Sequence, residues 1–185
     1  MKKLILTFIF GLITVTNVMA AEEMKYTMVS KNKLYEIRKY SDRLVIETEI
    51  SDQGSSFRKL FKYISGDNGD KKEIKMTTPV TQVEKDGNMT MQFYMPAEFN
   101  ESNVPDPNNS EVKVLNVKGG YYAAIVYSGR ASDGNYTKHK NILEDLLKKD
   151  KISIISKPIR ATYNSPFTLP MLRRNEVIFK IEKNT

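Results

Sequence analysis

The sequence predicts an α+β domain, in which an antiparallel sheet or distorted β-barrel carries two helices. Segments with the alternating pattern of strands outnumber those with helical periodicity. The order strand-strand-helix-strand-strand occurs twice, over residues 34–95 and 111–182. A chain of 185 residues can bury about 70% of its unfolded surface in one domain. The halves share no convincing residue-level identity, so the repeat is one of pattern only.

In the first half, the spacing of the apolar residues changes where the helix begins. Arg43 to Ser51 alternates apolar and polar residues, as a half-buried strand does. Apolar residues then recur at spacings of three and four between Gln53 and Ser65, which predicts a helix with one apolar stripe. That stripe consists of Phe57, Leu60, Phe61 and Ile64. The segment from Gly66 to Asp70 ends the helix, because Gly and Asn tolerate the left-handed conformation there.

The rest of the first half consists of short strands and a polar connector. Asp86-Gly87 is a strong hairpin signal between the last two of these strands. Residues 96–110 contain several prolines and asparagines, so we expect a connector there rather than a core element. The additional strands expected in this half are 26–32, 34–40, 78–85 and 88–95.

The second half repeats the order of the first. Its helix is expected from Asp133 to Lys149, with Ser132 or Asp133 as the N-cap. Gly119-Gly120 joins the two strands that precede this helix. The strands expected in this half are 111–117, 121–128, 152–163 and 175–182.

The first twenty residues have the order of a secretory signal peptide. Two lysines precede an apolar run from Leu4 to Val15, and small residues follow it. The run is shorter than the roughly 20 residues that span a bilayer. Cleavage is expected between Ala20 and Ala21, which leaves residues 21–185 as a single domain. We therefore predict a periplasmic or secreted protein with no membrane span after cleavage.

Composition narrows the class of function. The chain has no cysteine and a single histidine, His139, and no His/Cys/Asp grouping has zinc-ligand spacing. No glycine-rich loop follows a strand to cradle a phosphate. The formal net charge of +7 comes from scattered basic residues rather than a long basic run, which argues against a nucleic-acid partner. These features predict a protein that is not an enzyme.

Two unusual segments, each a loop that runs into a strand, carry a family resemblance. Residues 73–80 read EIKMTTPV, and residues 164–177 read NSPFTLPMLRRNEV. The opening strand from Tyr35 to Tyr40 and the stretch from Ser128 to Ala131 add to it. Together these segments resemble the SOUL haem-binding protein family over nearly the whole chain after the leader. The resemblance implies a pseudo-twofold barrel of two modules that binds haem or a related tetrapyrrole noncovalently in an apolar cleft.

On that resemblance, the first helix is the expected wall of the cleft. Its apolar stripe would face the macrocycle, and the cations that flank the stripe would reach the propionates. Packing in the core and a solvated helix face are the alternative interpretations. Met76 would add soft apolar surface, although filling gaps in the core is the usual role of methionine. The candidate cofactor-binding residues are Phe57, Arg58, Leu60, Phe61, Lys62, Ile64, Met76, His139 and Arg173.

Two of these candidates have a structural alternative. His139 lies on or beside the apolar face of the second helix. It is either a core-edge histidine with one hydrogen bond or an axial ligand to haem iron. Arg173 either ties down the preceding loop, through carbonyls or Glu176, or contacts a propionate.

Other classes of function stay open at this point. The same fold could serve as a binding module for another amphipathic small molecule, or as a protein-interaction domain. A third possibility is an enzyme that acts on tetrapyrroles. The response to added haem distinguishes the first two classes from haem binding, and turnover of the ring distinguishes the third.

Overall fold

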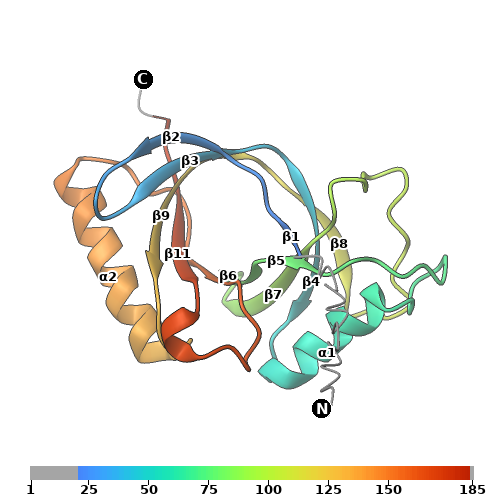
Figure 1. The fold of residues 1–185 in the computed structure, drawn as a ribbon. Helices are drawn as coiled ribbons and strands as arrows, with labels where there is room; N and C mark the ends of the chain where they lie inside the picture. The colour runs from blue at the N-terminus through green and yellow to red at the C-terminus, as the bar shows by residue number, and fades with distance from the viewer. Residues whose placement is uncertain (1–20, 184–185) are drawn as a thin grey trace, which may run out of the picture.

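The computed structural model describes residues 21–183, and the expected signal peptide, residues 1–20, lies outside them. The described chain forms strands and two α-helices, with one short 3₁₀ helix (Figure 1). The helices are α1 (Gln53–Ile64), α2 (Asp133–Lys149) and η1 (Pro170–Leu172). The strands are β1 (Glu22–Glu23), β2 (Thr27–Lys31), β3 (Glu36–Tyr40), β4 (Arg43–Glu49), β5 (Thr77–Thr78), β6 (Val80–Lys85), β7 (Asn88–Tyr94), β8 (Lys113–Val117), β9 (Gly120–Tyr127), β10 (Ile159–Thr162) and β11 (Asn175–Ile181).

Most of the strands form one antiparallel sheet, in the order β2-β3-β9-β11-β10-β6-β7-β4-β8. The short strands β1 and β5 pair separately, in parallel. Apart from β2, the order is symmetric about the β10–β6 pair: β3 corresponds to β8, β9 to β4 and β11 to β7. This symmetry confirms the predicted α+β class and its duplicated module. The sheet is open rather than closed into a barrel, with β2 and β8 at its ends.

Each half of the domain contributes one strand to the other half. β3 pairs with β9, and β8 pairs with β4, so strands joined by short connectors do not pair with each other. The connectors at residues 41–42 and 118–119 meet where the chain exchanges halves, and Gly119 N donates to Asp42 Oδ1 at 2.9 Å. A Cβ atom on Gly119 would lie 2.4 Å from the Tyr40 carbonyl oxygen. This crossing therefore requires glycine at position 119.

Both helices pack on the same face of the sheet. α1 contacts β4 and β7, and α2 contacts β9 and β11. Residues paired directly on neighbouring strands point to the same face of a sheet. A series of such pairs runs from Phe93 of β7 through β6, β10 and β11 to Tyr127 of β9, so Phe93 and Tyr127 lie on the same face. Leu60 anchors α1 in one core cluster, and Leu143 and Leu147 anchor α2 in another. Figure 1 shows the two helices at opposite ends of the curved sheet.

The opposite face of the sheet carries a buried ionic network. Arg38 of β3 is fully buried and donates from Nη1 and Nη2 to the two carboxylate oxygens of Glu176, at 2.7 and 3.0 Å. Glu36 accepts from the same guanidinium at 2.6 and 2.9 Å. Arg174 and Tyr163 also donate to Glu176. Burial alone would lower the pKa of Arg38, but the Glu176 carboxylate raises it above its usual value.

Two local predictions are confirmed by backbone geometry. Ser132 is the N-cap of α2, and its hydroxyl accepts from Asn135 N at 3.4 Å. Asp86 and Gly87 both have positive φ, 51° and 83°, as the tight turn of a two-residue hairpin requires. The α1 helix begins at the predicted residue, with Asp52 as its N-cap.

The strand predicted over 152–163 is longer than the strand in the structure. β10 begins only at Ile159, and the preceding residues run as irregular chain with an isolated bridge between Ile154 and Ile181. Pro158 has no amide hydrogen to donate to a neighbouring strand, which accounts for the late start of regular pairing.

We expect Gly119→Ala to destabilise the domain by about 1–3 kcal/mol or more, because the new methyl group would overlap backbone atoms that cannot rotate away. Chemical denaturation measures this change. Gly134→Ala is the control, since a Cβ at that position in α2 would meet nothing within 4 Å beyond its chain neighbours and the backbone of its own helix. The control should be neutral or stabilising by up to about 1 kcal/mol. Equal stability of the two variants would contradict the proposed constraint at the crossing.

Glu176→Gln should destabilise the domain by about 3–5 kcal/mol, because it removes one partner of a buried ion pair and leaves the guanidinium charge of Arg38 undercompensated. Thermal or chemical denaturation provides the measurement. Glu182→Gln, at an exposed position just after β11, should change stability by less than about 0.5 kcal/mol. A similarly small effect of Glu176→Gln would show that the network contributes little to folding.

Candidate functional site

α1 presents two exposed aromatic side chains. Phe57 is 40% exposed and Phe61 is 48% exposed. Their ring centroids lie 6.0 Å apart and their planes differ by 14°, so the two rings form one stacked pair. Phe57 also meets the buried Phe93 of β7 edge-on at 5.1 Å, which holds the pair against the sheet. The N-cap carboxylate of Asp52 accepts from Ser55 N at 3.0 Å and fixes the start of this helix.

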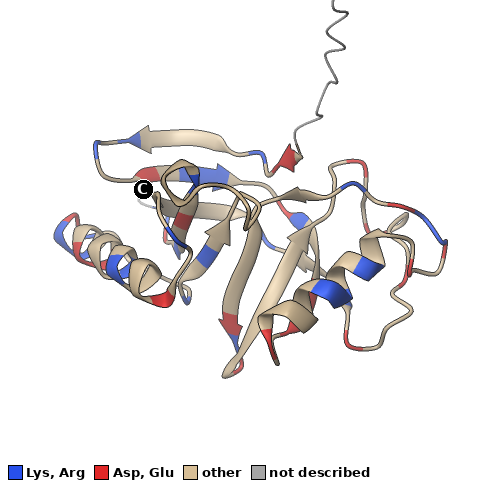
Figure 2. Cartoon of the chain, turned by 60° about the horizontal axis from the view of Figure 1, so that its bottom comes forward, with Lys and Arg blue, Asp and Glu red and all other residues tan. Residues whose placement is uncertain are grey.

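The other residues predicted on this helix divide between core and solvent. Leu60 and Ile64 are buried beneath the helix, so the predicted stripe is split into a buried half and an exposed half. Arg58 and Lys62 are exposed, each next in sequence to one of the exposed aromatic residues. Figure 2 shows basic residues along the middle of α1. Met76 is half-buried and packs against the same core cluster as the helix.

His139 lies on α2, apart from these residues. Its ring packs flat on Tyr127, with centroids 4.2 Å apart and planes 9° apart. Its Nδ1 atom lies 2.8 Å from the carbonyl oxygen of Asn135. Because a carbonyl oxygen can only accept, Nδ1 carries a proton in this contact, and a neutral ring keeps its lone pair on Nε2. The two helices rest on separate core clusters, so the structure does not bring His139 together with the candidates on α1.

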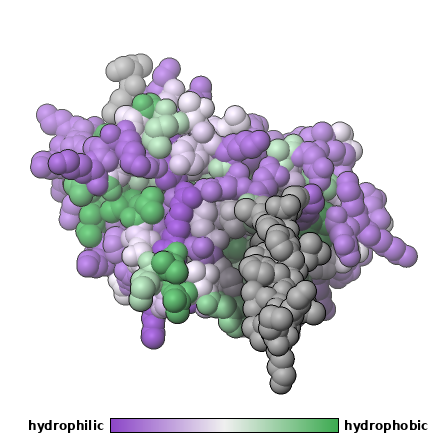
Figure 3. Space-filling view, in the orientation of Figure 1, coloured by the Kyte–Doolittle hydropathy of each residue, from purple (hydrophilic) through white to green (hydrophobic). Residues whose placement is uncertain are grey.

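The loop between β10 and β11 exposes several large apolar side chains. They are Phe167, which is 96% exposed, Leu169, Met171 and Leu172. Figure 3 shows apolar surface over the segment that contains η1. Arg173 donates from Nε to Thr168 O at 2.7 Å and from Nη2 to Pro166 O at 2.6 Å. Its guanidinium therefore ties this loop together through two carbonyl groups.

The second arginine of this segment is held differently. Arg174 pairs with Glu176 at 2.7 Å and with Glu23 at 2.5 Å, and its guanidinium lies 3.9 Å from the ring centroid of Tyr163. Burial would lower the pKa of Arg174, but Glu176 raises it above its usual value. Arg174 therefore connects the end of the loop to the ionic network of the sheet.

Sequence reasoning missed two features of potential functional value. The exposure of the apolar side chains in the loop could have been predicted from the sequence, because Phe167 and Leu169 lie between two prolines in a segment that forms no strand to bury them. The environment of Arg43 at the start of β4 could not have been predicted, because tyrosines from other strands surround it. Arg43 also lines a cavity of about 760 Å³ to which none of the candidate residues contributes.

Two kinds of feature are absent from residues 21–183. In this range no group of three or more His, Cys, Asp and Glu side chains is placed to hold a metal ion. No helix in the same range is long and apolar enough to cross a membrane. What α1 offers is an aromatic surface flanked by two cations.

Comparisons with known proteins show one family and a wider fold group. Residues 21–180 match the SOUL heme-binding protein family. Human heme-binding protein 2 is 30% identical over 169 residues, an alignment that covers 81% of this chain and 78% of the human protein. The mouse heme-binding protein 2 is 31% identical with the same coverage.

Solved structures share the fold at low sequence identity. The C-terminal domain of EcmrR has a TM-score of 0.60 at 12% identity, with 87% of this chain and 100% of that domain covered. An uncharacterized conserved protein from Listeria innocua has a TM-score of 0.61 at 9% identity, with 83% and 94% covered. At these identities the likeness concerns the fold alone.

Arg173→Gln should increase the rate at which chymotrypsin cleaves the loop after Phe167 by about tenfold, because the loop loses two hydrogen bonds from a charged donor. Limited proteolysis followed by mass spectrometry measures this rate. Arg130→Gln, at an exposed arginine before α2, is the matched control. Unchanged cleavage in Arg173→Gln together with weakened haem binding would instead assign Arg173 to ligand contact.

Proposed function

Because the chain belongs to the SOUL heme-binding protein family, we propose that it binds haem or a related tetrapyrrole noncovalently, as a binding protein rather than an enzyme. The proposed binding surface is the outer face of α1. Haem would bring to it a flat apolar ring with two carboxylate groups. The residues of α1 would supply apolar contact to the ring and positive charge to the carboxylates.

The stacked pair of Phe57 and Phe61 is the observation that carries this proposal. Both rings are rigid, lie nearly parallel and remain about half exposed, although each could have been buried on a helix that already has an apolar side. Aromatic rings gain stacking energy of about 0.5–1.5 kcal/mol beyond the burial of their area when they meet another π-system. A macrocycle laid on this pair would cover both rings at once.

The charges beside the pair suit the carboxylates of the ligand. Arg58 and Lys62 are exposed and each follows one of the aromatic residues in sequence, so long side chains can reach around the rim of a bound ring. Lys59 is already paired with Glu111 at 2.7 Å. Ion pairs between such cations and carboxylates are shorter and stronger than neutral hydrogen bonds.

The proposal does not depend on an axial ligand. His139 rests on α2, with its Nδ1 proton on a backbone carbonyl, a contact that commonly orients a metal-binding imidazole. Since α1 and α2 rest on separate core clusters, His139 would serve a ring bound elsewhere than on α1. Apolar contact alone can suffice, because large ligands gain up to about 0.3 kcal/mol per non-hydrogen atom.

We also propose that the protein acts outside the cytoplasm, in the periplasm or the medium. The signal-peptide pattern of residues 1–20 supports this location. The same pattern places the start of the mature chain at Ala21, and the family match begins at the same residue.

The exposed loop around η1 favours a second candidate function. Phe167, Leu169, Met171 and Leu172 form an apolar surface of the kind used to bind another amphipathic molecule or a protein. A protein of this class would keep the fold and show no saturable response to haem.

The decisive test is a haem titration of residues 21–185, followed by absorbance in the Soret region. We expect a saturable shift at one haem per chain. The double variant Phe57→Ala/Phe61→Ala should weaken binding by at least about tenfold, because it removes both stacking rings. Ile155→Ala, at a 51% exposed apolar position outside α1, should bind as the wild type does.

The variants also separate the possible binding modes. Absence of a saturable shift in the folded wild-type protein would sink the proposal. Unchanged affinity in the double variant would move the ligand away from α1. A displaced Soret maximum in His139→Ala would assign His139 as an iron ligand, whereas an unchanged spectrum would leave the ring held by apolar contact.

A further inference from the structure

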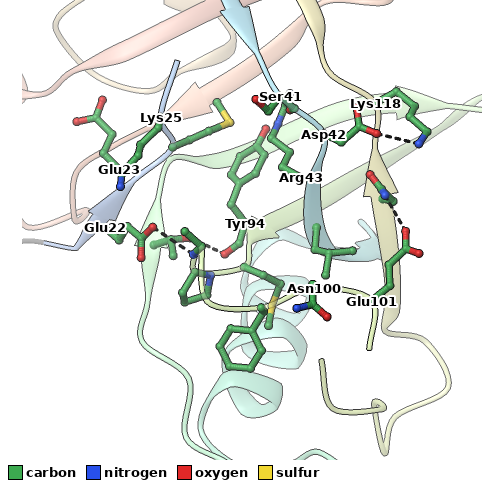
Figure 4. Close-up of a pocket in the computed structure, with 18 of the residues that line it drawn as sticks. Glu22, Glu23, Lys25, Ser41, Asp42, Arg43, Tyr94, Asn100, Glu101 and Lys118 are labelled. Carbon is green, nitrogen blue, oxygen red and sulfur yellow. Dashed lines mark hydrogen bonds and ion pairs between the residues drawn. The ribbon is translucent and has the colours of Figure 1, made fainter. Parts of the chain in front are cut away.

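A cavity of about 760 Å³ opens where β4 begins and β7 ends (Figure 4). Its apolar wall includes Leu44, Met95 and Phe99. The strand β1 and the connector after β7 contribute its other sides. The volume falls in the range of about 300–1,000 Å³ that is usual for pockets that bind small molecules. None of the candidate haem-binding residues lines this cavity, so it is a separate feature from the outer face of α1.

Arg43 lies in this cavity with donors to spare. Its guanidinium carbon is 4.9, 5.4 and 5.3 Å from the ring centroids of Tyr40, Tyr94 and Tyr122. Its Nε atom is buried and, among the described residues, has no hydrogen-bond partner. Nη1 makes only a long contact of 3.4 Å to the carbonyl oxygen of Ser41. Leaving a buried donor of a charged group unsatisfied is costly, so this group calls for an acceptor.

Among the described residues, the other arginines that are not exposed all have close oxygen partners. Arg173 donates to two backbone carbonyls. Arg38, Arg160 and Arg174 each pair with a carboxylate. Arg43 takes part in none of the ion pairs formed among residues 21–183. Faces of aromatic rings stabilise a cation, and here they do so from three sides. Nε is sealed from solvent by this enclosure, but Nη2 is not, and Nη2 has no hydrogen bond among the described residues, so an anion from solution can bind there.

The rim of the cavity limits the charge of such a ligand. Its acidic residues are Glu22, Glu23, Asp42 and Glu101. Asp42 is paired with Lys118 at 2.8 Å, and Glu23 with Arg174, so two of the carboxylates are already neutralised by cations of the protein. Figure 4 shows these acidic groups around the opening and Arg43 beside Tyr94. Lys25 and Lys118 also line the cavity, so cations offset part of this negative charge. A ligand with one carboxylate meets less repulsion at the rim than a ligand with several.

We propose that this cavity binds a small amphipathic monocarboxylate. The carboxylate accepts hydrogen bonds from the two Nη atoms of Arg43, a bidentate geometry that a guanidinium offers to a planar anion. The apolar body of the ligand packs against the wall that contains Leu44, Met95 and Phe99. The tyrosines hold the guanidinium in place before the ligand arrives, which lowers the entropy cost of binding.

Octanoate is the probe for this site, with octanol as its uncharged counterpart. We expect isothermal titration calorimetry to show saturable binding of octanoate at one per chain and at least about tenfold weaker binding of octanol. In the same titration, the Nε–H resonance of Arg43 in a proton–nitrogen NMR spectrum should move, because a carboxylate bound at the Nη atoms polarises the whole conjugated guanidinium. This readout uses the wild-type protein and does not depend on how any variant folds.

Arg43→Gln is the matching variant, and Arg58→Gln on the outer face of α1 is its control. Arg43→Gln should weaken octanoate binding to the level of octanol, and Arg58→Gln should leave it unchanged. Equal binding of octanoate and octanol, or an Nε–H resonance that stays in place at saturation, would overturn the proposal. If Arg43→Gln fails to fold, the NMR result on the wild type decides the question.

The haem proposal and the carboxylate proposal can be tested independently of each other. Phe57→Ala/Phe61→Ala should lose haem affinity and keep octanoate binding, because the stacked pair does not line the cavity. A protein that binds octanoate at Arg43 without binding haem would keep this inference and lose the proposed function.

Discussion

The close crossing of two connectors is the constraint on which the rest of the structure depends. Gly119 lies so near the backbone at Tyr40 that no side chain can be present, and Asp42 accepts its amide hydrogen. The crossing exchanges β3 and β8 between the halves, so neither half can complete its part of the sheet alone. It also gathers the residues that flank both connectors. Tyr40 and Arg43 flank one connector, and Tyr122 follows the other near the start of β9, so two of the three tyrosines that enclose Arg43 are brought to it by the crossing.

The face of the sheet away from the helices contains two arginines whose guanidinium groups have different kinds of partner. Arg38 has two carboxylates, and its charge is satisfied within the protein. Arg43 has aromatic faces and a cavity instead. A fold can tolerate the first arrangement as pure structure, because every donor has an acceptor. The second leaves donors of a charged group unpaired beside a cavity, which is the reason for proposing a ligand there.

The two proposed binding surfaces would hold their ligands through different interactions. The outer face of α1 is aromatic and flanked by exposed cations, which suits a large flat ligand held mainly by contact area. The cavity at Arg43 has an apolar wall, and one charged group sets its preference. α1 and the cavity share a core cluster that includes Leu44 and Met95, so both are built on the same end of the sheet. His139 belongs to the other end, where it packs on Tyr127.

Local patterns in the sequence determined both α-helices and most of the strands, the N-cap at Ser132, the Asp86-Gly87 turn and, through short motifs, the family. These features depend on neighbouring residues, and periodicity or turn chemistry reports them directly. Only the tertiary structure decided which residues of the α1 stripe stay exposed. Periodicity shows that Phe57 and Leu60 share a side of the helix, but whether β4 and β7 cover each of them depends on how the helix is rotated on the sheet. The environment of Arg43 was likewise undetermined, because its tyrosines come from three strands that meet only after the connectors cross. Contacts between residues far apart in the chain leave no periodic signal, so packing alone could settle them.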